Sequence, residues 1–241
     1  MNSHLTGLAV RERLIVALDV ATQEEAIALV AKLTGKISFF KIGLQLYTAA
    51  GPEIVRKVAA TGAKIFLDLK LHDIPNTVAK AIAAASELDV QMLTLHLTGG
   101  RAMIEAAVAV RRPGLTLLGV TALTSVDEET MREVGVESSM EDQVVRLAQL
   151  GKRCGVDGLV ASPHEVTALR AAMGEAMTIV TPGVRPDWVQ ADDQKRFATP
   201  AQALDAGADY LVIGRPITAH AEPATAAEKI FEEIALRRIP P

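Results

Sequence analysis

The sequence predicts a single (β/α)8 barrel, the TIM-barrel class of α/β fold. Its 241 residues suit one domain of this class, since such barrels typically fill about 250 residues. Short apolar runs rich in β-branched residues alternate about eight times with longer, alanine-rich amphipathic runs, which is typical of strand–helix units. Polar residues follow the predicted strands at the end where barrels of this class place their sites. A doubly wound open sheet is the alternative, but no G-x-G-x-x-G follows the first predicted strand.

Each predicted strand is a short apolar run, and each predicted helix is a longer run with an amphipathic period. The strands are expected, in chain order, at residues 14–18, 39–42, 64–69, 92–97, 116–121, 158–161, 177–180 and 210–213. The helices are expected at residues 24–32, 52–60, 77–88, 101–110, 141–154, 165–172, 200–206 and 224–236. Glycines that fit the position just after a helix stand before several strands; they are Gly35, Gly62, Gly155 and Gly207.

The composition is that of a globular protein and argues against two kinds of partner. Hydrophobic residues make up 49% of the chain and charged residues 22%. A net charge of −4 and an aromatic content of 3% disfavour nucleic-acid binding, which needs basic stripes and stacking platforms. No apolar run approaches the roughly 20 residues of a membrane-spanning helix. We expect residues 1–241 to form one catalytic domain, with residues 1–13 and 237–241 as terminal extensions.

The single cysteine bears on location and on metal binding. Cys154 has no partner for an internal disulfide and cannot form a cysteine-based metal site. It fits the reducing cytoplasm, where we expect the protein to reside. The amino terminus has no long apolar segment of the signal-peptide kind. No His, Asp and Glu residues have the spacing of a metal-ligand set, so we expect no metal site.

The segment 64–77 begins as an apolar strand and ends in a group of charges. Asp68 and Lys70 share one face of a strand, because the side-chain period of a strand is two, and the neighbouring leucines take the other face. If the leucines face the helices, the charges face the inside of the barrel. Breaking a buried ion pair costs about 3–5 kcal/mol, so we interpret these charges, with Asp73, as functional. The alternative for Asp73 is a helix-start residue, because Pro75 fits a first helical turn.

Charged residues at other strand ends extend this group. Asp19 ends the first strand and Lys41 lies in the second, so lysines and aspartates can alternate around one cavity. Opposite unit charges about 4 Å apart attract by roughly 4 kcal/mol at an effective dielectric constant of 20, so such an array needs no metal to hold it together. It would also hold a lysine as a proton donor. The alternative for Lys41 and Lys70 is that each only extends its ammonium group to solvent.

The last two loops indicate a phosphate site. Barrels often bind phosphate with the loops after strands seven and eight. Arginine offers a two-pronged donor to phosphate, and glycine allows close backbone approach. The candidates are Pro182, Arg185, Gln194, Gly214 and Arg215. Residues 182–198 show no clean period and are interpreted as a binding loop or lid, with an ordinary surface loop as the alternative. His96, on an apolar strand, fits a core histidine better than a base.

Together these motifs resemble the orotidine 5′-phosphate decarboxylase family. The resemblance rests on FLDLKLHDIPNT at residues 66–77, with ALD at 17–19, KIG at 41–43, LTS at 123–125, TPGVR at 181–185, DQ at 193–194 and VIGRP at 212–216. These motifs span nearly the whole chain in the family's order. The resemblance implies a carboxy-lyase that converts orotidine 5′-monophosphate to uridine 5′-monophosphate and CO₂ without a cofactor, within pyrimidine synthesis.

The resemblance also implies residue roles. Lys70 is expected to protonate C6 of the pyrimidine, within a charged array completed by Lys41, Asp68 and Asp73. Asp73 and Thr77 are expected to reach the active site of the partner subunit in a homodimer. The remaining residues are expected to contact the substrate. Asp19 and Lys41 would bind the ribose, and Thr124 or Ser125, with Gln194, would bind the pyrimidine and phosphate ends. Arg185, Gly214 and Arg215 would bind the phosphate.

The sequence leaves two alternative functions possible. Related barrels that act on sugar phosphates with Mg²⁺, such as 3-keto-gulonate-phosphate decarboxylase, share an Asp-x-Lys-x-x-Asp motif. They place an acidic residue where this chain has Lys41, which argues against them. A non-catalytic phosphate-binding barrel is the second alternative.

Overall fold

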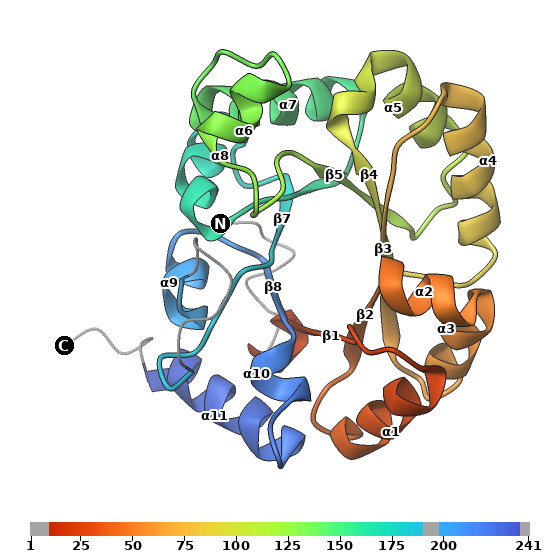
Figure 1. Cartoon of the computed structure of the whole chain (residues 1–241), viewed down its shortest axis with the longest axis vertical. Helices are drawn as coiled ribbons and strands as arrows, with labels where there is room; N and C mark the ends of the chain where they lie inside the picture. Colours follow the sequence, from red (N-terminus) through yellow and green to blue (C-terminus); the bar gives the residue numbers. More distant parts are fainter. Residues whose placement is uncertain (1–9, 190–197, 237–241) are drawn as a thin grey trace.

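The computed structural model describes residues 10–189 and 198–236, and these form a closed parallel barrel (Figure 1). Its strands pair in chain order, and β8 closes the ring on β1. The strands are β1 (Leu14–Ala17), β2 (Phe39–Gly43), β3 (Lys64–Leu71), β4 (Met92–His96), β5 (Thr116–Val120), β6 (Gly158–Val160), β7 (Thr178–Thr181) and β8 (Tyr210–Ile213). The predicted (β/α)8 fold class is confirmed.

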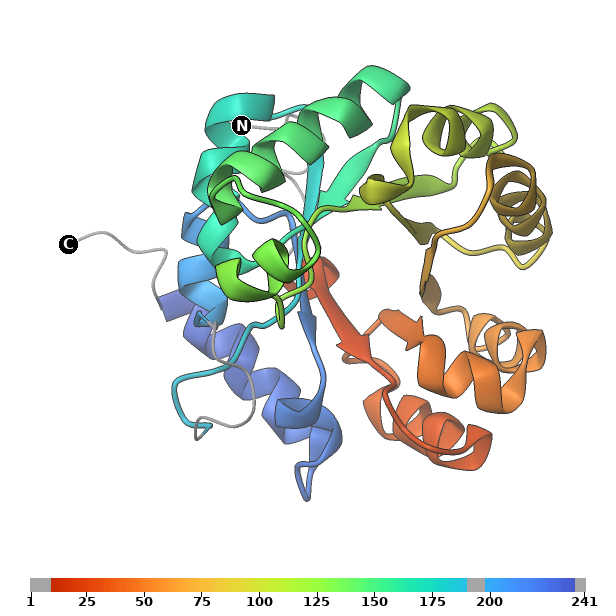
Figure 2. The ribbon, with the colours of Figure 1, turned by 45° about the horizontal axis from the view of Figure 1, so that its top comes forward.

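Helices surround the barrel on its outer side (Figures 1 and 2). They are α1 (Gln23–Leu33), α2 (Leu44–Ala50), α3 (Pro52–Ala59), α4 (Pro75–Ser86), α5 (Gly100–Ala109), α6 (Glu128–Glu133), α7 (Met140–Cys154), α8 (Val166–Met173), α9 (Pro200–Asp205), α10 (Arg215–Thr218) and α11 (Pro223–Leu236). Short 3-10 turns occur at Val10–Arg13, Leu97–Gly99 and Pro163–Glu165. Within the described ranges, no helix has the length and apolar character needed to cross a membrane.

The predicted helices are all present, and three further helices were not predicted. These are α2, α6 and α10, of 7, 6 and 4 residues. Helices this short span about two turns or fewer, so the 3.6-residue period that reveals a helix has too few repeats. The glycine predictions hold, since the four predicted glycines have φ between +77° and +108°. Gly155 shows why: it ends α7 in the left-handed region, where a side chain is disfavoured.

Side chains of the strands alternate between two separate cores. In β1, Leu14 and Val16 point outward to the helices, whereas Ile15 and Ala17 point into the barrel. The interior core also contains Phe66 on β3, and near the amino-terminal ends of the strands the ring of Phe39 meets Tyr210 edge to face at 6.0 Å. The interior is therefore filled near its base, and the space for a ligand lies at the carboxyl ends of the strands.

Ion pairs fix the segments that precede two of the strands, one pair largely buried and the other half-buried. Asp209, just before β8, accepts a hydrogen bond from the backbone N–H of Ile179 at 2.7 Å and pairs with Arg170 of α8. Asp157, just before β6, likewise accepts a hydrogen bond from the backbone N–H of Leu117 and pairs with Arg111. These carboxylates tie neighbouring strands together at the amino-terminal face. Structural charges thus occupy one end of the barrel and leave the other end for chemistry.

We predict that Asp209→Ala destabilises the protein by about 3–5 kcal/mol, because it removes the carboxylate that pairs with the largely buried Arg170 side chain. Urea unfolding monitored by circular dichroism measures this free energy. Glu53→Ala is the matched control, since it breaks the exposed Glu53–Arg56 pair of α3 and should change stability by about 1 kcal/mol or less. Equal losses in the two variants would contradict the structural role of Asp209.

Candidate active site

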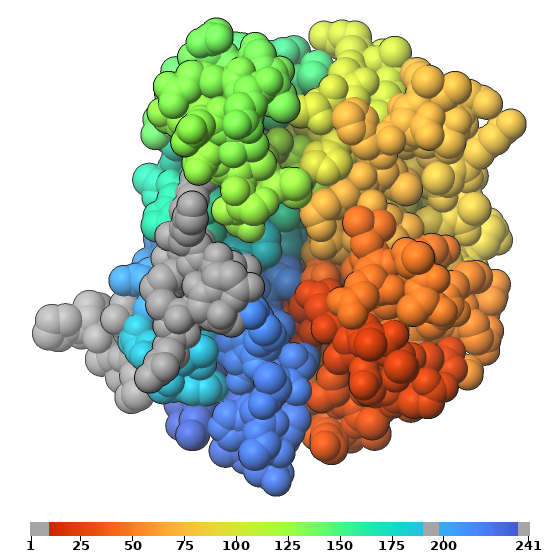
Figure 3. Space-filling view, viewed as in Figure 1, coloured from red at the N-terminus to blue at the C-terminus, as the bar shows by residue number. Residues whose placement is uncertain are grey.

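A cavity of about 630 Å³ opens at the carboxyl ends of the strands. Figure 3 shows the molecule hollowed there, between the red and orange elements and the blue ones. This volume falls within the range of small-molecule sites. Five apolar side chains of the barrel interior line it: Ala17, Phe66, Val120, Val160 and Val212. Charged side chains lie above this apolar floor, in two separate groups.

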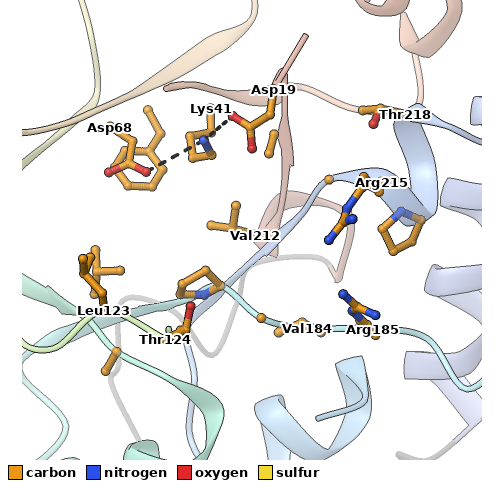
Figure 4. Close-up of a pocket in the computed structure, with 18 of the residues that line it drawn as sticks. Asp19, Lys41, Asp68, Leu123, Thr124, Val184, Arg185, Val212, Arg215 and Thr218 are labelled. Carbon is orange, nitrogen blue, oxygen red and sulfur yellow. Dashed lines mark hydrogen bonds and ion pairs between the residues drawn. The ribbon is translucent and has the colours of Figure 1, made fainter. Parts of the chain in front are cut away.

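The first group is an alternating chain of carboxylates and ammonium groups. Lys41 Nζ lies 2.8 Å from Asp19 Oδ1 and 3.8 Å from Asp68 Oδ2, and Lys70 Nζ lies 2.7 Å from the same Asp68 oxygen. Lys41 and Asp68 are each only 8% exposed, and weak screening by solvent strengthens such attractions. Figure 4 shows the first two contacts on one side of the cavity. The structure therefore brings together four of the predicted residues.

Gly43, at the end of β2, leaves room for this array. A Cβ at this position would stand 2.7 Å from Lys41 Nζ and 3.0 Å from Asp19 Oδ1. A side chain here would therefore displace the Lys41 ammonium group and crowd Asp19, and glycine lets both groups keep their positions.

Thr94 on β4 completes the surroundings of Asp68 and was not predicted. Its hydroxyl donates to Asp68 Oδ1 at 2.9 Å and accepts from the backbone N–H of Lys70 at 2.9 Å. The sequence carried one signal for it: a polar residue two positions after Met92, on the strand face that points into the barrel. A threonine in an apolar strand is too common for this signal to single it out.

The second group consists of two arginines on the other side of the cavity. In Figure 4 the guanidinium groups of Arg185 and Arg215 point toward one another, across from Asp68 and Lys41. Arg185 follows β7 and is only 6% exposed, and Arg215 begins α10, separated from β8 by one residue. Pro182 and Gly214 line the cavity beside them. Two convergent guanidinium groups suit a doubly charged oxyanion such as a phosphate.

The remaining predicted residues divide between the cavity and the surface. Thr124 lines the cavity, whereas the neighbouring Ser125 is exposed and does not. Asp73 and Thr77 are also exposed and lie outside the cavity lining of this chain. Asp73 Oδ1 accepts a hydrogen bond from the backbone N–H of Ile74 at 2.6 Å. Gln194 falls in residues 190–197, outside the described residues.

Two histidines stand beside the array. The rings of His72 and His96 lie 5.6 Å apart, tilted by 44°. Burial lowers the pKa of His96 below its ordinary 6.5, and the nearby His72 and Lys70 lower it further against the opposing effect of Asp68. His96 is thus neutral at pH 7, and its side chain does not line the cavity.

The fold and this cavity place the chain among the (β/α)8-barrel enzymes that act on phosphorylated small molecules. Residues 12–230 match the model described as the "Orotidine 5'-phosphate decarboxylase / HUMPS family". The match covers most of the chain, which therefore belongs to this family, and the family predicted from the motifs is confirmed.

Individual relatives agree with this assignment. The chain is 52% identical over 234 residues to "Orotidine 5'-phosphate decarboxylase" of Syntrophotalea carbinolica, covering 93% of this chain and 96% of the relative. It is 50% identical over 232 residues to the protein of the same name from Trichlorobacter lovleyi, covering 93% and 95%. Its structure matches the crystal structure of orotidine 5'-phosphate decarboxylase from Lactobacillus acidophilus with a TM-score of 0.82 and 37% identity, covering 92% and 99%.

We predict that His72→Gln raises the pKa of His96 but leaves it below 6.5. The variant removes the charge of His72, while burial, the larger cause of the shift, remains. An NMR titration of the imidazole Cε1–H signals measures this pKa. His164→Gln, which changes an exposed histidine, is the control and should leave His96 unaffected. An unchanged or lowered His96 pKa in His72→Gln would show that the two rings do not interact.

Proposed function

We propose that the chain decarboxylates orotidine 5′-monophosphate to uridine 5′-monophosphate, the activity that the names of its relatives describe. The observation that carries the proposal is the Asp68 carboxylate, which holds the Lys70 ammonium 2.7 Å away beside a cavity with two arginines at its other side. This arrangement can hold a phosphate at one end and place a proton donor at the other. The reaction belongs to pyrimidine nucleotide synthesis, which agrees with a cytoplasmic location.

The chemistry requires a positive charge at the reacting carbon. When the bond between C6 and the carboxylate breaks, CO₂ leaves and the electron pair stays on C6, where the ring cannot delocalise it. The Lys70 ammonium stabilises this charge by position alone and then transfers its proton to C6. The neutral amine regains a proton from solvent. Positioned proton transfer of this kind typically contributes about 10²–10⁴-fold to a rate.

The other groups are assigned to different parts of the substrate. Asp19 and Lys41 are assigned to the ribose hydroxyls, and Thr124 to the pyrimidine. Arg185, Gly214 and Arg215 are assigned to the phosphate, together with Gln194. Asp68 keeps Lys70 in place. It is also assigned to repel the substrate carboxylate, although the contribution of such repulsion to catalysis is contested. Binding energy from the phosphate can then be used at the distant reacting carbon.

The charges of the array favour this reaction over the Mg²⁺-dependent one of related barrels. Lys41 Nζ stands between the carboxylates of Asp19 and Asp68, so a divalent ion held by these two carboxylates would have to displace an ammonium group. In the described part of the chain, no group of three or more His, Cys, Asp or Glu side chains is arranged to hold a metal ion. The ammonium group of Lys41, at the place between the two carboxylates, is what disfavours magnesium there.

We predict that the purified protein consumes orotidine 5′-monophosphate and that Lys70→Ala reduces kcat by at least about 10²–10⁴-fold with the fold retained. The fall in substrate absorbance measures activity, and circular dichroism checks folding. Lys64→Ala is the matched control, since Lys64 is exposed at the start of the same strand, and it should leave kcat unchanged. Activity lost in EDTA and restored by Mg²⁺ would favour the sugar-phosphate class, and a fully active Lys70→Ala would contradict the role of Lys70.

We further propose that two copies of the chain form a homodimer with shared active sites. Asp73 and Thr77 lie at the surface next to Ile74, which is 65% exposed, and Leu44 is another exposed apolar side chain. Exposed apolar side chains of this size suit a protein–protein contact. A contact there would let each chain lend Asp73 and Thr77 to the cavity of the other. The site would then be complete only in the dimer.

We predict that coexpressed Asp73→Ala and Lys70→Ala chains regain activity that neither chain has alone. In a mixed dimer, one of the two sites combines Lys70 from one chain with Asp73 from the other, and the second site lacks both. With random pairing in a two-fold dimer, activity should reach about a quarter of wild type. Separately expressed chains that stay unmixed are the control. Absence of recovery in verified mixed dimers would contradict a shared site.

A further inference from the structure

The backbone of Lys70 is held in an unusual conformation. Its φ is +50°, in the left-handed region that residues other than glycine rarely adopt. Such conformations persist only where the surroundings hold them, and they occur preferentially at functional sites. Something next to Lys70 must therefore stabilise this backbone.

The pairing of β3 with β4 shows where the irregularity arises. Leu67 pairs with Leu93, but the next pair is Leu71 with Leu95. Three residues of β3, from Asp68 to Lys70, thus stand opposite the single residue Thr94 of β4. This extra length is a β-bulge, a feature that redirects side chains near active sites. In a regular ladder a backbone carbonyl would accept the Lys70 N–H, and here the Thr94 hydroxyl accepts it at 2.9 Å.

The same hydroxyl also orients the partner of Lys70. A threonine hydroxyl has one donor and two acceptor positions, so Thr94 can accept from Lys70 N–H while it donates to Asp68 Oδ1 at 2.9 Å. The other Asp68 oxygen binds Lys70 Nζ at 2.7 Å. Thr94, Asp68 and both ends of Lys70 therefore form a closed ring of hydrogen bonds. Thr94 is fully buried at 0% exposure, so water does not compete for its hydroxyl.

We infer that Thr94 is a positioning residue for the decarboxylation, an inference that rests on the proposed function. Its side chain does not line the cavity and acts through Lys70 and Asp68. Without the hydroxyl, the Lys70 N–H loses its acceptor and Asp68 loses one of its donors, so the bulge relaxes and the ammonium moves away from the reacting carbon. A displacement of about 1 Å at a reacting group can slow catalysis about 10²-fold. The arginines at the phosphate end are not part of this ring.

The test compares three variants with wild type. Thr94→Val keeps the shape but removes the hydroxyl, Thr94→Ser keeps the hydroxyl, and Thr94→Ala serves if the valine variant does not fold. Ser86→Ala is the matched control, because it removes another buried hydroxyl, one that donates to Ile82 O on α4 away from the cavity. Circular dichroism checks folding, and steady-state kinetics with orotidine 5′-monophosphate gives kcat and KM separately.

We expect kcat to fall about 10²-fold in Thr94→Val, with KM little changed and with kcat largely restored in Thr94→Ser. The control should lose stability but keep its kcat. A kcat of Thr94→Val equal to wild type, or a fall no larger than that of Ser86→Ala, would overturn the inference while the proposed function stands. A wild-type chain inactive on this substrate would overturn the proposed function and the role of Thr94 with it.

Discussion

The buried carboxylate of Asp68 is the constraint on which the site depends. A carboxylate this deeply buried is stable only when its oxygens are paired and hydrogen-bonded. Lys41 and Lys70 supply positive charge to one oxygen, and Thr94 donates to the other. With Asp19, the array contains two carboxylates and two ammonium groups, so its formal charge is zero and it can line a cavity with an apolar floor. Each lysine is held by an ion pair with Asp68, and both lysines line the cavity.

The barrel separates the charges that tie its strands together from those that line the cavity. Asp157 and Asp209 bind arginines and backbone N–H groups at the amino-terminal face, where they fix the positions of neighbouring strands. The array and the two arginines lie at the opposite face. Because the apolar interior core lies between them, the site can contain unusual features, such as the left-handed backbone of Lys70, while the strands remain paired at their other end.

Much of the fold and of the cavity lining was predictable, because the alternation of side chains along a strand is local in sequence. The period of two placed Asp68 and Lys70 on the inner face, and the chain order placed Asp19, Lys41 and Arg185 at strand ends that meet in a barrel. The role of Thr94 was not predictable, because it arises from a shift of register between two strands that no local pattern records. The choice between Thr124 and Ser125 also depended on the path of the loop after β5, which brings only Thr124 to the cavity. Asp73 and Thr77 depend on a second copy of the chain and stay predictions, and Gln194 lies outside the described residues.

The end of β3 divides the charged residues of this stretch between the cavity and the surface. In a regular strand, residues at even spacing share one face, so His72 would follow Asp68 and Lys70 into the cavity. In the structure β3 ends at Leu71, and His72 and Asp73, which follow it, are exposed before α4 begins at Pro75. Two charged residues of the stretch thus face the cavity of their own chain, and a third lies at the surface. The proposed dimer with shared sites requires this division, and the end of β3 at Leu71 provides it two residues before Asp73.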